Sequence, residues 1–245
     1  MVSAGEEYAG LPGGVAVSRL SVYDWPAADG VSGGTPHMHL TCSEAYVVTG
    51  GRGAVQTLTA SGYQVTPLEP GTVAWFTPGT IHRLVNEDAL RITVLMQNSG
   101  LPEAGDAVLT LPPRHLTDPE TYAAATVVPA DAPEAERERI TRARRDLAVE
   151  GFLALRAAEG PEALAEFHRA AAALVGPRLA EWRERWRRGA RAAAAATGEQ
   201  LDRLATGDVG HLATAAVHAE QPSERGRFGM CGRLDVYPAG SGPGA

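Results

Sequence analysis

Short runs in which apolar and polar residues alternate occupy roughly the first hundred positions of the chain. They are separated by turn residues such as Gly50-Gly51, Pro70-Gly71 and Pro78-Gly79, which end strands. The predicted strands are Val15–Tyr23, Glu44–Thr49, Gly53–Thr59, Tyr63–Pro67, Thr72–Phe76, His82–Val85 and Leu90–Gln97. Many short strands at close, even spacing predict an antiparallel sandwich or barrel, here over residues 1–111.

From about residue 119 the apolar positions recur at helical spacing, first around Phe152 and then around Phe167. Pro161 and Pro177 each follow a glycine, in the place favoured at a first helical turn. Thr197, with Gln200 three residues later, resembles a capping box that opens another helix. The pattern predicts a mainly α-helical region over residues 134–220, joined to the strands by a proline-rich connector over residues 112–133.

An extended segment is predicted again near the end of the chain. Arg227–Tyr237 contains RLDVY, which echoes RLSVY at Arg19–Tyr23. Within residues 221–238 we favour a last strand that returns to the barrel and covers an open edge. The alternative is the stub of a second barrel. Residues 239–245 are expected to form a disordered tail.

Composition limits the partners and the compartment. The formal net charge of -7 argues against a nucleic-acid partner, for which a basic patch is expected. No stretch approaches the ~18 apolar residues that span a bilayer. Cys42 and Cys231 are too few for a disulfide framework, and no secretory signal is recognisable. We therefore expect a cytoplasmic protein without a membrane partner.

Three histidines and one glutamate form a candidate metal site. His37 and His39 are two residues apart, so on an extended strand both side chains point to the same face. Glu44 follows after a short turn, and His82 comes just after the turn at Thr77–Gly79. Inside a barrel, four such polar groups would be costly to bury without a metal. A lone buried histidine is more often a hydrogen-bonded core residue, but four groups in this pattern favour a metal centre.

These residues give the chain a resemblance to the cupin family, over about residues 15–100. The first cupin motif, G-x5-H-x-H-x3–4-E-x6-G, is matched by His37, His39, Glu44 and Gly51, with its leading glycine displaced. The second, G-x5-P-x-G-x2-H-x3-N, is matched by Gly71, Gly79, His82 and Asn86. Thr77 occupies the proline position of the second motif, with Pro78 one place later.

The resemblance implies a cupin β-barrel, or jelly roll, that binds one divalent transition metal through His37, His39, Glu44 and His82. Fe(II) is favoured, with Mn, Ni, Co, Cu and Zn as alternatives. The function expected first is a metal-dependent enzyme, of the oxidoreductase or dioxygenase type, acting on a small oxygen-rich organic molecule. A cupin isomerase, lyase or cyclase, or a non-catalytic small-molecule-binding module, is the alternative. A homodimer is also expected as a possibility.

Further residues have two interpretations each. Tyr46 shares the face of Glu44 and is a candidate catalytic residue, although tyrosine is also a good strand former. Thr93 and Gln97 line the pocket if their face points inward and are otherwise exposed. Cys42 is either a redox-active thiol or a buried filler of the turn. One of Trp75 and Phe76 should line the barrel, since they point to opposite faces of one strand. Trp182 and Trp186 should pack a helix onto the barrel. Four histidines lie outside both motifs: His115, His168, His211 and His218.

Overall fold

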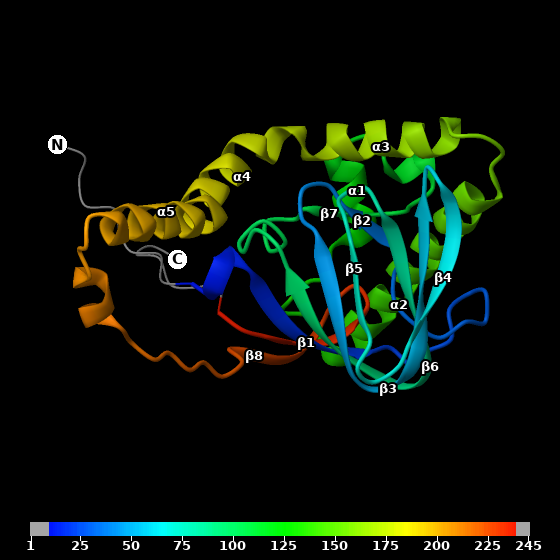
Figure 1. The fold of residues 1–245 in the computed structure, drawn as a ribbon. Helices are drawn as coiled ribbons and strands as arrows, with labels where there is room; N and C mark the ends of the chain where they lie inside the picture. Colours follow the sequence, from blue (N-terminus) through cyan, green and yellow to red (C-terminus); the bar gives the residue numbers. More distant parts are fainter. Residues whose placement is uncertain (1–9, 239–245) are drawn as a thin grey trace.

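The computed structural model describes residues 10–238, so the predicted tail at 239–245 lies outside the described residues. Within that range, nine strands form one antiparallel sheet (Figure 1). Their bounds are β1 Ala16–Val22, β2 His37–His39, β3 Glu44–Thr59, β4 Gly62–Leu68, β5 Val73–Phe76, β6 Ile81–Met96, β7 Ala107–Leu109, β8 Glu224–Phe228 and β9 Gly232–Val236.

A long ribbon of β3 and β6 is the centre of the sheet. The two strands pair antiparallel from Glu44 opposite Met96 to Leu58 opposite Ile81. Each was expected as two strands, but each is continuous. The glycines of β3 that were expected to end a strand lie instead at irregularities in its pairing with β6, between Val48 and Gly53. Gly51 has a φ of +73°, and a Cβ there would overlap the carbonyl oxygens of Asp88 and Ala89. The glycine therefore permits a bulge that bends the ribbon without ending it.

Because the ribbon bends, its two halves carry different neighbours. The first half of β3 pairs with β5, and the second half of β6 pairs with β1. The other half of the ribbon carries β4 and β2, and β2 in turn pairs with β7. The main path of pairing among the described strands, β4-β3-β6-β1-β9-β8, does not close into a ring. The structure thus establishes an antiparallel sheet, without the hydrogen-bonded closure of a complete barrel.

The C-terminal hairpin of β8 and β9 joins this sheet through β1. Leu20 lies opposite Leu234 in the antiparallel β1–β9 pairing. The turn of the hairpin lies against the segment before β2, where Thr35 N donates to Met230 O at 3.0 Å. A Cβ at Gly34 would lie 2.8 Å from the Cα of Cys231, so this close approach requires glycine.

The region between β7 and β8 is mainly helical. Its α-helices are α1 Pro119–Thr126, α2 Glu134–Ala157, α3 Glu162–Val175, α4 Leu179–Trp186 and α5 Ala192–Ala205. Helix α1 lies inside the stretch expected to be a connector, and Asp118 caps it by accepting from Thr121 N at 2.9 Å. Figure 1 shows α3 running across one end of the sheet, with α4 leading from it towards α5.

The capping box predicted at Thr197 is wrong. A π-helical turn at Arg187–Arg191 joins α4 directly to α5, which already begins at Ala192. The alanine run at 192–196 has high helix propensity and keeps the helix going. The Thr197 hydroxyl instead donates back to Ala193 O at 3.5 Å, as a threonine inside a helix does.

Helices α2, α3 and α4 pack apolar side chains on the sheet and share one hydrophobic core with it. Phe152 of α2, Phe167 of α3 and Trp182 of α4 belong to the same buried cluster as Leu84 and Ile92 of β6. Trp182 also donates its indole N–H to Ala104 O at 3.2 Å. None of the described helices has the length and apolarity needed to cross a bilayer.

Candidate metal centre

The four candidate ligands come together inside the fold. His37 of β2 lies directly opposite His82 of β6, and Glu44 begins β3, which pairs along β6. One ligand atom from each of His37, His39, Glu44 and His82 lies within 4.8 Å of the other three, and all four residues are buried. The cluster can hold a metal ion.

The closest approaches are between nitrogen and oxygen atoms that point at a common centre. His82 Nε2 lies 3.1 Å from His37 Nε2 and 3.1 Å from Glu44 Oε2. His39 Nε2 lies 3.3 Å from the same Glu44 oxygen. Despite these distances, Glu44 Oε2 is buried and has no hydrogen-bond partner of suitable geometry among the described residues.

The other ring nitrogen of each histidine faces an acceptor. Nδ1 of His37 lies 2.9 Å from Thr35 O, and Nδ1 of His82 lies 3.1 Å from Thr80 O. A carbonyl oxygen only accepts, so these nitrogens carry the proton and each Nε2 presents a lone pair to the centre. Two lone pairs 3.1 Å apart repel unless a cation lies between them. The donor set therefore fits a transition metal.

The pKa shifts of His37 and Glu44 agree with this donor set, whereas at His39 burial lowers the pKa but hydrogen bonds with Asp106 and Glu44 raise it to about 9, so a metal would have to displace a proton there. Burial lowers the pKa of His37 well below its usual value, and the neighbouring histidines lower it further. Burial alone would raise the pKa of Glu44, but its proximity to the rings of His82 and His39 holds it below its usual value. His37 is thus neutral and Glu44 ionised, which are the forms that bind metals.

Asp106 is a site residue that the sequence analysis missed. Burial alone would raise its pKa, but hydrogen bonds with His39 and Thr41 and the charge of His39 together outweigh burial and lower it. Its Oδ2 accepts from His39 Nδ1 at 3.2 Å, and its Oδ1 accepts from Thr41 N at 2.9 Å and from the Thr41 hydroxyl at 2.7 Å. Asp106 therefore orients His39 and the turn between His39 and Glu44. A lone aspartate far along the chain carries no motif by which it could have been found.

Replacing Asp106 by Asn should weaken metal binding by about 10- to 100-fold, the usual cost of losing a carboxylate behind a histidine ligand. The amide oxygen can still accept from Thr41, but an NH₂ group in place of Oδ2 cannot accept from His39. Competition with a chromogenic chelator measures the dissociation constant, and exposed Asp24→Asn is the matched control. Equal affinity in both variants would disprove this role of Asp106.

A cavity of about 160 Å³ reaches the cluster, and His37, His39 and Glu44 line it. Its other walls come from β1, the end of β6 and the C-terminal hairpin, through mostly apolar side chains such as Leu20, Val94 and Leu234. A small molecule with an apolar part can therefore enter from this side and meet the ligand atoms.

The structure places the remaining candidates as follows. Tyr46 is fully buried beside the cluster, and its ring lies 6.4 Å from that of His82. Its hydroxyl has no hydrogen-bond partner among the described residues, and burial raises its pKa well above the usual value. Phe76 lines the inside, 4.2 Å from the His82 ring, whereas Trp75 is 72% exposed.

Thr93 lies on the face of β6 opposite to the buried Ile92, Val94 and Met96, and Gln97, directly after β6, is exposed. The inward orientation considered for them is therefore wrong, and Gln97 instead accepts from Ser43 N at 3.3 Å. Other candidates stay outside the ligand cluster: Cys42 and the histidines His115, His168, His211 and His218.

Both cysteines are buried, and burial raises the pKa of each thiol. Cys42 is 1% exposed in the turn before β3, and its backbone N donates to Asp106 Oδ2 at 3.2 Å. Cys231, brought in by the C-terminal hairpin, has its Sγ 4.0 Å from His37 Nδ1. Both side chains are therefore protonated thiols at neutral pH, and their surroundings are those of packing residues.

Comparisons with known proteins give a likeness of fold over part of the chain. No protein-family model matches, and no curated protein matches. Among solved structures, Pac13 from Streptomyces, described as a nucleoside dehydratase, is 14% identical, with a TM-score of 0.27 over 39% of this chain and 63% of that one. The TDP-quinovose 3,4-ketoisomerase WlaRB from Campylobacter jejuni is 13% identical, with a TM-score of 0.29 over 33% of this chain and 60% of that one.

A protein from Thermotoga maritima, described as a predicted oxalate decarboxylase, is 19% identical, with a TM-score of 0.26 over 34% of this chain and 64% of that one. The chain thus spans about three-fifths of the length of these structures. At such identities and scores the likeness gives no information about substrate or reaction.

Proposed function

We propose that this chain is a metal-dependent cupin enzyme that acts on a small oxygen-rich organic molecule. Its metal ligands would be His37, His39, Glu44 and His82, within a β-barrel of the jelly-roll type. One observation carries the proposal: histidine Nε2 lone pairs and an ionised carboxylate converge on one point beside an open cavity. Such a set is costly to bury without a cation.

Fe(II) is the metal we propose first, with Mn, Ni, Co, Cu and Zn as alternatives, because imidazole and carboxylate ligands suit all of them. When bound, the metal would supply a Lewis acid or activate dioxygen. Four protein ligands leave one or two coordination positions for the substrate or water, as a catalytic site requires.

The residues of the chain would bind and shield the substrate. Leu20, Val94 and Leu234 offer apolar surface for its carbon skeleton and exclude water from the ligand atoms. Tyr46 is the candidate catalytic residue. Since its pKa is raised, its hydroxyl stays protonated and would donate a hydrogen bond to a developing negative charge next to Glu44.

The reaction we propose first is oxidation by dioxygen. Isomerase, lyase or cyclase chemistry is the alternative, and each of these needs the same metal to polarise a carbonyl or hydroxyl oxygen of the substrate. A small-molecule-binding module without turnover is the second class of function. The open, partly apolar cavity beside the ligands is compatible with all of these.

The test loads the purified chain with one equivalent of Fe(II) under nitrogen, transfers it to air-saturated buffer and then offers a panel of small hydroxy acids, enols and keto acids. The expected result is oxygen consumption that matches product formation by mass spectrometry and requires Fe(II). Conversion without oxygen consumption would replace the dioxygenase by isomerase or lyase chemistry. Ligands that raise the melting temperature but are never converted would overturn the enzyme proposal in favour of a binding module.

A homodimer stays a prediction. Exposed apolar side chains on and after α5, including Leu201 at 63% and Leu212 at 60%, are compatible with it. Light scattering of the full chain measures its mass in solution, and a monomeric mass at micromolar concentration would contradict it.

A further inference from the structure

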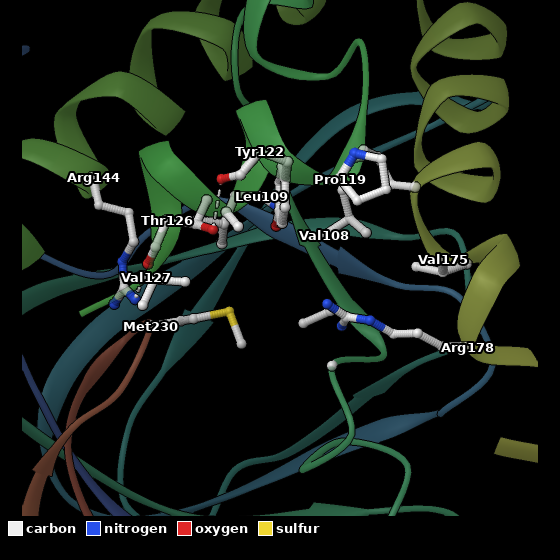
Figure 2. Close-up of a pocket in the computed structure, with 14 residues that line it drawn as sticks. Val108, Leu109, Pro119, Tyr122, Thr126, Val127, Arg144, Val175, Arg178 and Met230 are labelled. Carbon is white, nitrogen blue, oxygen red and sulfur yellow. Dashed lines mark hydrogen bonds between the residues drawn. The ribbon is translucent and has the colours of Figure 1, made fainter. Parts of the chain in front are cut away.

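A second cavity, of about 250 Å³, lies between β7, α1, α2 and the end of α3 (Figure 2). Two arginines, Arg144 and Arg178, give the cavity its charged groups, and Tyr122 adds an aromatic hydroxyl. Its apolar walls include Val108 and Val175. Met230 alone among the lining residues is shared with the metal-site cavity. The two cavities are therefore separate sites in contact with one methionine.

Arg144 brings a half-buried positive charge to this cavity from α2. Its guanidinium donates to Thr126 O at 3.2 Å and to Gly229 O at 2.9 Å, while its Nε is buried without a partner. No described carboxylate lies within ion-pair distance of it. A positive charge that is partly removed from water and has no counter-charge is unfavourable. An anion bound in the cavity would therefore stabilise Arg144.

Buried arginines elsewhere in the chain do have carboxylate partners. Arg83 pairs with Asp29 at 2.6 Å, and Arg145 pairs with Asp146 at 3.1 Å. The fold thus neutralises guanidinium groups elsewhere in its interior. Arg144 differs from these two arginines in having no carboxylate partner among the described residues.

Arg178 reaches the cavity from the opposite side. Its guanidinium donates to Ala104 O at 3.5 Å and lies over Gly105, where a Cβ would overlap Nη1. It also has no ion-pair partner among residues 10–238. Figure 2 shows the side chains of Arg144 and Arg178 entering the pocket from its two sides.

Tyr122 adds a third donor. Its hydroxyl oxygen accepts from Leu109 N at 3.0 Å, and no acceptor for its own proton is found among the described residues. The lining contains no aspartate or glutamate. The side-chain donors of the cavity therefore offer two guanidinium groups and one hydroxyl proton, with no competing negative charge, although the chain as a whole carries -7.

We propose that this cavity binds a small organic anion with one or two carboxylate or phosphate groups. Guanidinium groups match the planar, two-oxygen edge of these anions. A volume of about 250 Å³ lies just below the 300–1,000 Å³ typical of pockets for drug-sized ligands. The apolar walls leave room for a short carbon chain between the charged groups.

The experiment is isothermal titration calorimetry of the full, metal-free chain with succinate, with inorganic phosphate and with neutral succinamide as the uncharged isostere. We expect saturable binding of succinate or phosphate, weakened by added salt, and none of succinamide. Succinate binding alone would identify a carboxylate site, and phosphate binding alone a phosphate site. No saturable binding of either anion, or equal binding of succinamide, would overturn the proposal.

Variants locate the binding. Arg178→Gln should weaken the anion at least tenfold, whereas Arg183→Gln, the same charge change at an exposed position of α4 outside the cavity, should not. Arg144→Lys keeps the positive charge but loses the paired N–H donors of the guanidinium, so it should also weaken anion binding. The melting temperature of this variant shows whether the fold is intact. Equal affinities for Arg178→Gln and Arg183→Gln would overturn the assignment. The metal content of Arg178→Gln should stay at the wild-type level, so a failed anion site and a failed metal site are distinguishable.

Discussion

Replacing His82 by Ala is expected to reduce metal binding by about two to three orders of magnitude. Structural zinc sites are worth about 10–16 kcal/mol over four ligands, or about 2.5–4 kcal/mol per ligand. His82 is fully buried, and its Nε2 is 3.1 Å from both His37 Nε2 and Glu44 Oε2.

Metal analysis after dialysis measures this loss, together with the rise in melting temperature that a bound metal gives the wild type. His115→Ala is the matched control, because His115 lies outside the cluster. His82→Gln keeps most of the side-chain volume and separates the loss of a ligand from a loss of packing. Wild-type affinity in both His82 variants would disprove the assignment of the metal centre.

Gly151→Ala is expected to destabilise the fold by about 1–3 kcal/mol, the usual cost of overpacking a core. Gly151 lies within α2, where alanine would normally be favoured by about 1 kcal/mol. A Cβ there would overlap Thr110 O and lie 2.8 Å from the carbonyl carbon of Leu111. Both neighbours are backbone atoms, so relief requires the helix to move away from the sheet.

The same contact connects α2 to the strand that holds His37. The hydroxyl of Thr110, a buried residue, lies 2.8 Å from Ala148 O in α2 and 3.2 Å from Pro36 O, next to His37.

Chemical denaturation measures the free energy of unfolding. Gly198→Ala in α5 is the matched control: nothing lies within 4 Å of its added Cβ, so it should stabilise the protein by up to about 1 kcal/mol. A stabilising Gly151→Ala would contradict the close helix–sheet contact.

The sequence by itself determined most of the extended segments of the sheet and the candidate ligands, because both depend on short-range spacing, but it did not determine where β3 and β6 run on or that residues 224–236 form a hairpin. His37 and His39 share a face through the two-residue period of a strand. Glu44 and His82 each follow a recognisable turn, and the pairing of β2 with β6 then brings the side chains together. The apolar spacing around Phe152 and Phe167 likewise predicted the helices that pack on the sheet.

Tertiary structure alone decided which distant groups meet. Asp106 hydrogen-bonds to His39 from 67 positions along the chain, and Arg144 and Arg178 face one cavity from different elements. The sequence does not explain why a glycine stands at position 151 inside a helix. The structure explains it, because the backbone of Thr110 lies too close for a side chain. Local spacing encodes the period of one element, whereas these contacts depend on how elements pack, which no pattern within a single segment contains.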